Sequence, residues 1–125
     1  MVLPASVLPA GCQSREVRQG QALYASQCAR CHGEEGVGQD PRRPFGGIDP
    51  ALGPIAPALN GRGHCWYHPP GELFQIVKDG SSVPGSPMPA WGDRLSDTQI
   101  RAVIAYLHSL WPRYIQRQYG RIDGA

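Results

Sequence analysis

Two cysteines three positions apart, with a histidine directly after the second, constrain this chain more than any other feature. They are Cys28, Cys31 and His32, in the stretch YASQCARCHGEEG at residues 24–36. The apolar pattern of the preceding residues predicts a helix over residues 15–33. Side chains three positions apart on a helix lie on one face, about one turn apart. The fold must therefore present two thiols and an imidazole together at a helix end.

Cys-x-x-Cys-His is the attachment signature of a c-type haem, in which two thioethers tether the ring and the histidine reaches the iron. Three other interpretations compete with it. A thioredoxin-like redox pair follows a strand, and no strand is predicted before Tyr24. A zinc site could recruit Cys65 with His64 or His68, but it would lack a second close ligand pair. A structural disulfide, or chance, is the third alternative.

Glycine and proline are unusually frequent, with 16 and 13 residues among 125. This content is too high for a chain of long helices or extended sheet, so much of the backbone must run as loops. Residues 33–63 carry most of it and form the longest predicted loop. A loop of this length in a compact domain usually covers something, and a small loop-rich chain usually needs a cofactor, metal or disulfide for stability.

Three helices are predicted, over residues 15–33, 68–80 and 96–112. Gly20 lies on the inner face of the first, where glycine costs about 1 kcal/mol relative to alanine, so we expect the last helix to cross closely there. Ser96 and Gln99 form a capping box at the start of that last helix, and Pro112 ends it. Its inner face comprises Ile100, Val103, Ile104, Leu107, Leu110 and Trp111. No strand is predicted, so the fold class is all-α, with three to five short helices and long loops.

The charge and hydropathy patterns exclude two classes of protein. The formal net charge of +2 is small and the basic residues are scattered, which argues against a nucleic-acid-binding surface. No apolar run is long enough for a membrane-spanning helix. Residues 1–14 are uncharged and are interpreted as a residual export signal or linker. We expect one domain over residues 15–118 and a tail over 119–125.

Met88 is the one methionine besides Met1. It lies in the stretch GSPMPAWGD, with a proline on each side. A thioether is a suitable haem ligand, and a methionine opposite a histidine raises the reduction potential. A lone methionine in a loop more often fills a gap in the packing. The flanking prolines favour the ligand interpretation, because they stiffen a loop that must hold a weak ligand in place.

Over residues 15–112 the chain resembles the small class I cytochromes c. The resemblance rests on Gly20 and Tyr24, on the Cys-x-x-Cys-His motif, and on three further stretches, namely PALNG at 57–61, MPAWGDRLSD and IRAVIAYLHSLW. It implies a cytochrome c fold wrapped around one covalently attached haem. It also implies that Gly20 and Tyr24 meet Tyr106 and Leu107 where the terminal helices cross.

The resemblance further implies roles for individual residues. Cys28 and Cys31 would form the thioethers, and His32 and Met88 would ligate the iron. The carbonyl of Pro57 would accept a hydrogen bond from the other ring nitrogen of His32, which fixes the tautomer and strengthens the ligand. Leu59 would pack on the haem face.

Several polar residues fall outside this pattern. Arg62 and Trp66 are candidates for hydrogen bonds to the haem propionates. His64 and His68 are expected to face solvent, with an alternative role as iron or copper ligands.

Two further cysteines, Cys12 and Cys65, would pair in an oxidising compartment if they are close in space. Alternatively, Cys12 in LPAGC is the lipid-bearing residue of a bacterial lipoprotein.

These features together predict a monohaem c-type cytochrome that carries single electrons between redox proteins outside the cytoplasm. Since both axial positions are filled, it is expected to be a carrier and not an enzyme. It is also expected to be a monomer. Its partner would be a terminal oxidase, a quinol-oxidising complex or a copper reductase. The alternatives are a haem-based sensor or peroxidase-like protein with a labile Met88 bond, or a cytochrome c module held within a respiratory complex.

Overall fold

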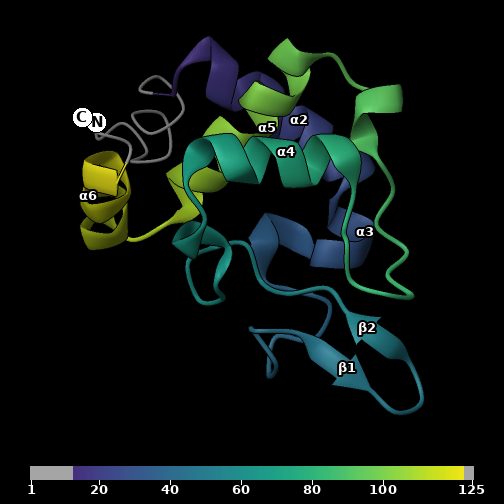
Figure 1. Ribbon diagram of the computed structural model, residues 1–125. Helices are drawn as coiled ribbons and strands as arrows, with labels where there is room; N and C mark the ends of the chain where they lie inside the picture. Colours follow the sequence, from purple (N-terminus) through teal and green to yellow (C-terminus); the bar gives the residue numbers. More distant parts are fainter. Residues whose placement is uncertain (1–12, 123–125) are drawn as a thin grey trace, which may run out of the picture.

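The computed structural model describes residues 13–122, with side chains described up to residue 119. Within this range the chain forms five α-helices, three short 3-10 helices and one pair of strands (Figure 1). In chain order these are α2 (Arg15–Gln27), α3 (Ala29–His32), η1 (Glu34–Gly36), β1 (Gly47–Asp49), β2 (Gly53–Ile55), η2 (Cys65–Tyr67), α4 (Pro70–Asp79), η3 (Trp91–Asp93), α5 (Asp97–Leu110) and α6 (Arg113–Ile122).

Helices α2 and α5 cross closely, as the glycine in the first helix predicts. A Cβ atom on Gly20 would overlap the carbonyl oxygen of Ala102 and would lie 3.0 Å from the Cβ of Tyr106. One turn further on, the rings of Tyr24 and Tyr106 are in contact, with centroids 5.3 Å apart. Gly20 therefore allows two backbones to approach at a distance that no other residue would permit.

The helices predicted over residues 68–80 and 96–112 are confirmed as α4 and α5, with each end within two residues of the prediction. Helix α5 begins with the capping box, in which the Ser96 hydroxyl accepts from the Gln99 backbone N–H at 3.1 Å and the Gln99 side chain accepts from the Ser96 N–H at 2.9 Å. Helix α4 has Pro70 at its first position and ends at Gly80. Proline is tolerated there because the first helical N–H groups have no partner within the helix.

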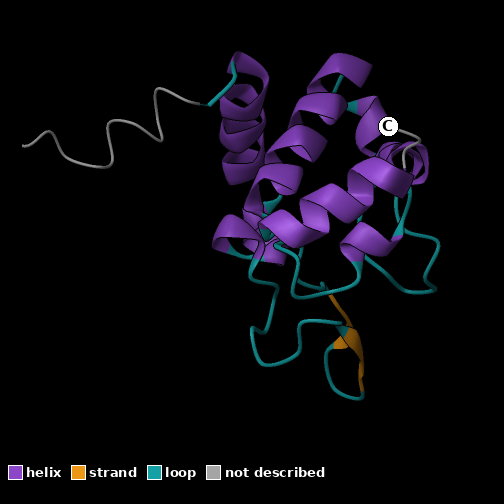
Figure 2. Ribbon diagram, turned by 90° about the vertical axis from the view of Figure 1, so that its left-hand side faces the viewer, coloured by secondary structure: helices purple, strands orange, loops and turns teal. Residues whose placement is uncertain are grey.

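The expectation that the chain has no strand is wrong for residues 47–55. Strands β1 and β2 pair antiparallel, with Gly47 opposite Ile55 and Asp49 opposite Gly53. Each strand has only three residues, too few to show an alternating pattern in the sequence. The hairpin extends from one end of the helical body (Figure 2), and the fold remains essentially all-α.

Helix α6 is a second feature that the sequence analysis does not predict. It begins after Pro112 and continues through the expected boundary between the domain and a tail at residues 118 and 119. Ile115 and Tyr119 are buried on its inner face, at 1% and 4% exposure. Residues up to Tyr119 therefore belong to the folded body.

The core consists of two clusters. The larger joins α2, α4, α5, α6 and η2, and contains Tyr24, Cys65, Leu73, Val103, Tyr106, Leu107, Trp111, Ile115 and Tyr119. The smaller contains Trp91, Leu95 and Ile100, against which Met88 and Phe74 pack. Between residues 13 and 122, no helix has the length and apolar character needed to cross a bilayer.

Candidate functional site

Cys28, Cys31 and His32 lie where α2 gives way to α3. Cys28 joins the two helices, and its carbonyl oxygen accepts from the N–H groups of Cys31 at 3.2 Å and His32 at 3.0 Å. This hydrogen bonding keeps the motif in one helical turn. Cys28 is half-buried and Cys31 is exposed. The turn thus presents both thiols and the imidazole together, as the spacing predicts.

The imidazole of His32 is held by a single backbone oxygen. Its Nδ1 lies 2.9 Å from the carbonyl oxygen of Pro57, so the hydrogen bond predicted between these residues is present. A carbonyl only accepts, so Nδ1 carries the proton and Nε2 is left as the basic nitrogen. Burial lowers the pKa of His32 despite this bond. The ring is therefore neutral at pH 7, with one nitrogen ready to bind a metal.

The backbone after His32 is fixed by contacts that the sequence analysis does not predict. The Tyr24 hydroxyl donates to the carbonyl oxygen of Gly33 at 2.6 Å, and the N–H of Gly38 donates to the carbonyl of His32 at 2.6 Å. Gly33 has a φ of 78°, in the left-handed region, where a side chain is unfavourable. Tyr24 is inferred from the sequence only as a packing residue, because its periodicity reveals burial and not hydroxyl bonding.

Residues 57–59 run back along this turn and are anchored at Leu59. The Leu59 N–H donates to the carbonyl of Gly36 at 2.7 Å, and its own carbonyl accepts from the Trp111 indole Nε1–H at 2.8 Å. The Trp111 bond links two positions 52 residues apart, and no local pattern predicts it. Trp111, at the end of α5, therefore anchors residues 57–59, and the Pro57 carbonyl of this segment orients His32.

Met88 lies in the loop between α4 and η3. Its side chain is half-buried and packs on the cluster of Trp91, Leu95 and Ile100, while its N–H donates to the Ser86 hydroxyl at 3.3 Å. The loop also passes tightly over the end of α4, because a Cβ on Gly80 would lie 3.1 Å from the Met88 carbonyl oxygen. The thioether is thus carried by a restrained segment.

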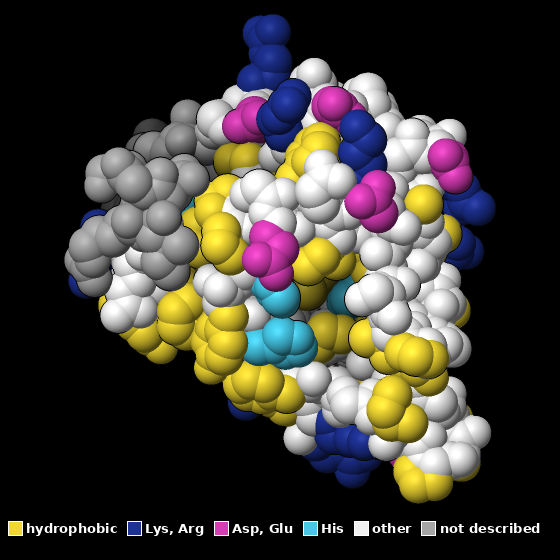
Figure 3. All heavy atoms as spheres, viewed as in Figure 1, with side chains coloured by type: hydrophobic (Ala, Val, Ile, Leu, Met, Phe, Trp, Pro, Cys, Tyr) yellow, Lys and Arg dark blue, Asp and Glu magenta, His cyan; other side chains and the backbone are white. Residues whose placement is uncertain are grey.

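The surface below α4 is hollowed, and hydrophobic and histidine side chains border the hollow (Figure 3). The donor set at the motif fits a c-type haem, because it offers two thiols on one turn and an imidazole with a free Nε2. Burial, followed by the neighbouring Cys31, raises the pKa of the Cys28 thiol to about 11. The Cys28 side chain is therefore a neutral thiol at neutral pH.

The four polar candidates between the loop and α4 lie in different surroundings. Arg62 is exposed, and only its backbone N–H is bonded, to the Asn60 side chain at 3.1 Å. Trp66 is half-buried, packs on the larger core cluster and contacts the Tyr67 ring edge-on, with centroids 4.7 Å apart. No described contact joins Arg62 to Trp66.

His64 and His68 are neighbours, with ring centroids 6.0 Å apart. His68 Nδ1 lies 2.7 Å from a carboxylate oxygen of Glu72, and His64 stacks on the exposed ring of Phe45. Burial and then the nearby His68 lower the pKa of His64. Among residues 13–122, no group of three or more His, Cys, Asp or Glu side chains is arranged to hold a metal ion.

Cys65 is buried at 5% exposure in the larger core cluster, and burial raises the pKa of its thiol to about 12. It therefore behaves as a small apolar side chain of the core. Cys12, expected to pair with it or to carry a lipid, lies outside the described residues, as do the other residues up to 12 of the predicted signal segment.

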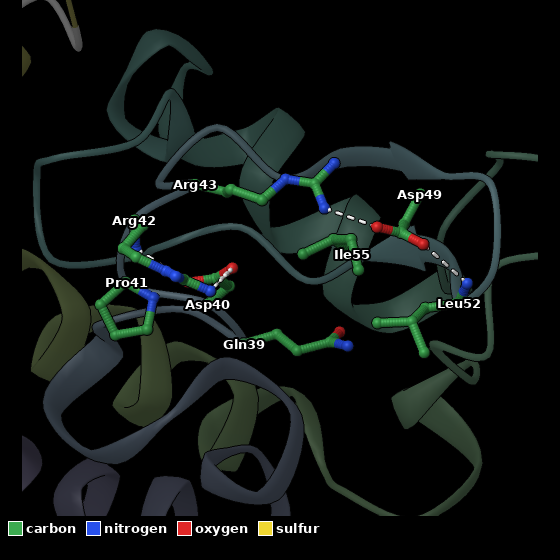
Figure 4. A pocket seen from close by; sticks show the side chains of 8 residues that line it. All are labelled: Gln39, Asp40, Pro41, Arg42, Arg43, Asp49, Leu52 and Ile55. Atoms are coloured by element: carbon green, nitrogen blue, oxygen red, sulfur yellow. Dashed lines mark hydrogen bonds and ion pairs between the residues drawn. The ribbon is translucent and has the colours of Figure 1, made fainter.

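A separate pocket lies on the hairpin (Figure 4). Its charged groups are paired with one another, since Arg43 contacts Asp49 at 3.0 Å and Arg42 contacts Asp40 at 3.2 Å. Backbone N–H groups and then Arg43 lower the pKa of Asp49. None of the predicted site residues lines it, so this pocket is separate from the Cys-x-x-Cys-His turn.

Comparison with known proteins agrees with this geometry. Residues 15–107 match the family described as cytochrome C oxidase, cbb3-type, subunit III. The subunit FixP of a cbb3-type cytochrome c oxidase from Azorhizobium caulinodans is 34% identical over 93 residues, which are 74% of this chain and 27% of that protein. The corresponding CcoP subunit from Azospirillum sp. (strain B510) is 30% identical over 95 residues, 76% of this chain and 29% of that protein.

A third relative, CcoP from Cereibacter sphaeroides, is 30% identical over 92 residues, 74% of this chain and 27% of that protein. The chain thus spans less than a third of the length of these curated relatives. No solved structure matches it significantly. Because the family match covers most of the chain and includes the whole Cys-x-x-Cys-His turn, the chain belongs to the family of cbb3-type cytochrome c oxidase subunit III and contains a c-type cytochrome domain.

Proposed function

We propose that this chain carries single electrons on one covalently attached haem c. The cytochrome c family to which it belongs supports a haem, and the sequence contains a single Cys-x-x-Cys-His motif, which supports a count of one. When bound, the haem supplies one-electron redox chemistry. The chain would bind, orient and bury it, and would act as a carrier without a substrate site of its own.

The observation that carries this proposal is the hydrogen bond from His32 to Pro57 at 2.9 Å. It leaves the Nε2 atom of a neutral imidazole as the one available ring nitrogen, next to two thiols on the same turn. Cys28 and Cys31 would form the thioethers, and His32 would be one axial ligand. A backbone acceptor that fixes the tautomer also makes the ligand more basic.

Met88 would be the second axial ligand. Its packing against the cluster of Trp91, Leu95 and Ile100 supports a stable bond between the Met88 sulfur and the iron. A sensor or peroxidase would instead need this bond to be labile. With both axial positions filled, small molecules would be excluded from the iron. Leu59 would pack on the ring, and Arg62 and Trp66 would bond the propionates.

The partner we propose is a terminal oxidase outside the cytoplasm. The relatives are named as subunits of cbb3-type cytochrome c oxidases, which supports a place for this domain as a cytochrome c module within or beside such a complex. The domain itself would be monomeric and periplasmic, with any membrane anchor near its N-terminus at Cys12.

The test is to produce the exported chain in a host that matures c-type cytochromes. We expect a pyridine haemochrome assay to give one haem per chain and mass spectrometry to place it on the peptide containing Cys28 and Cys31. The Cys28→Ala, Cys31→Ala variant should lack covalent haem, whereas Cys65→Ala should retain it. In stopped-flow experiments the reduced protein should be oxidised by a purified cbb3-type oxidase. A colourless mature protein, or haem retained covalently by the double variant, would refute the proposal.

A further inference from the structure

The outer face of helix α6 carries two exposed arginines, Arg113 and Arg117. Ile115 and Tyr119 point into the core, at 1% and 4% exposure. At about 100° per residue, Arg117 projects about 180° away from the midpoint of these two side chains. Arg113 is exposed one turn before it. Arg121 continues the four-residue spacing in the sequence. The helix therefore has an apolar inner face and a basic outer face.

The described residues do not neutralise this positive charge. No salt bridge involves Arg113 or Arg117 within residues 13–119. In the sequence, no acidic residue occurs between Asp97 and Asp123, a segment that holds four arginines, namely Arg101, Arg113, Arg117 and Arg121. Three of these arginines belong to α6, whereas Arg101 lies in α5 over the ring of Phe74.

The helix is fixed in the orientation that exposes this face. Its inner residue Ile115 packs where Gly61 has no side chain, since a Cβ there would lie 3.4 Å from the Ile115 Cδ1. The side chain of Gln116 donates to the carbonyl of Trp111 at 2.8 Å. The basic face is therefore presented rigidly, and a partner that binds it does not have to order the helix first.

Tyr114 lies beside the arginines and is 60% exposed. An aromatic ring with a polar tip, next to basic residues, is the side-chain combination found at the boundary of a bilayer. Guanidinium groups bind phosphate oxygens in bidentate fashion. Charges one turn apart on one helix face match a flat anionic surface, which requires no groove on the protein.

From this charge segregation and the exposed tyrosine beside it, we propose that the outer face of α6 binds the anionic phospholipid headgroups of a membrane. The binding would hold the domain against the bilayer by a surface distinct from the Cys-x-x-Cys-His turn, which lies on α2 and α3. The proposal does not depend on the haem, so it can fail while the proposed electron-carrier function stands, and the reverse also holds.

The test is co-sedimentation of the haem-loaded chain with vesicles of phosphatidylcholine alone or mixed equally with phosphatidylglycerol. We expect binding to the anionic vesicles that weakens at high salt. A basic residue near an anionic surface raises partitioning about fivefold, so the Arg113→Gln, Arg117→Gln variant should bind about 25-fold more weakly. The control is Arg15→Gln, Arg18→Gln, which removes the same charge from exposed positions of α2.

Pelleted protein is the readout, and the absorption spectrum confirms that each variant is folded. Equal binding to neutral and anionic vesicles, or equal weakening by the two double variants, would overturn the proposal. Size-exclusion chromatography of the same samples tests whether a second copy of the chain binds this face instead. A dimer that forms without lipid and dissociates in the α6 variant would show that the face joins copies of the chain, and would also overturn the proposal.

Discussion

Met88 is the residue on which the proposed electron-carrier function depends most directly. Replacing it with leucine keeps the side-chain volume against Trp91 and Leu95 but removes the sulfur, and such swaps usually cost less than about 1.5 kcal/mol. We expect Met88→Leu to lose the weak long-wavelength band of methionine-ligated ferric haem. The reduction potential should fall by about 59 mV for each tenfold loss of preference for ferrous iron.

The matched control for this prediction is Val83→Ala in the same loop, because Val83 is 46% exposed. It should leave both the spectrum and the potential unchanged. If Met88→Leu behaved like this control in absorption and voltammetry, Met88 would not be an axial ligand.

His64 should titrate below the ordinary histidine value of 6.5, because burial and then the neighbouring His68 lower its pKa. Because the pKa of His64 is lower in the folded chain than in the unfolded chain, the unfolded chain binds the proton more readily, and low pH therefore favours unfolding. The free energy of unfolding should therefore decrease as the pH falls through 6.5. NMR titration of the ring protons would measure the pKa directly.

In the His68→Asn variant the pKa of His64 should move up, but only in part, because burial is the larger cause. A pKa of His64 at or above 6.5 in the wild-type chain would contradict this prediction.

The sequence predicts single residues well where a motif has strict spacing. Cys28, Cys31 and His32 come together on one turn, and His32 is bonded to Pro57 as the resemblance implies. The hydrogen bonds of Tyr24 and Trp111 are not predicted. A backbone carbonyl occurs in every residue and leaves no signal in the sequence, so such a bond is predicted only where the resemblance supplies it, as it does for His32 and Pro57.

At the scale of elements, the crossing of α2 and α5 at Gly20 makes the sharpest prediction. Alanine is the better helix former by about 1 kcal/mol, but its Cβ would overlap the Ala102 carbonyl. Forcing the helices apart usually costs about 1–3 kcal/mol. We therefore expect Gly20→Ala to lower the free energy of unfolding in urea denaturation.

Gly71→Ala in α4 is the matched control, because a Cβ at this position would meet nothing within 4 Å. It should be neutral or slightly stabilising. Should Gly20→Ala also prove neutral, the helices would not be in the close contact described.

The elements that the sequence predicts are those with local signals. Helix α4 has Pro70 at its first position and Gly80 after its last residue, and α5 has a capping box and a long apolar face, so both are predicted to within two residues of their ends. Helix α6 has only Ile115 and Tyr119 as buried residues in the range where side chains are described, which is too short a pattern to recognise. The hairpin is missed because three-residue strands depend on pairing with each other and not on periodicity.

At the scale of the whole molecule, the two core clusters are small, and the long segment from residue 33 to 63 contributes none of their buried side chains, since its buried Ile55 and Ala58 lie outside both clusters. A haem would give this segment an apolar surface to cover. We expect the Cys28→Ala, Cys31→Ala variant without haem to be largely unfolded, with much less helical circular dichroism than the mature protein. Full helix content in that variant would show that the chain folds without its cofactor.

The β1–β2 hairpin has a consequence for how this family tolerates changes in length. Its base is closed by Gln39 and Ala56, joined by two hydrogen bonds of 3.0 Å, while Ile48 and Leu52 at its end are 62% and 69% exposed. Once the base is closed, doubling the length of such a loop costs only about 0.6 kcal/mol. Insertions and deletions that separate this chain from its relatives are therefore expected to accumulate between residues 40 and 55, and reporter peptides grafted there should leave the redox centre undisturbed.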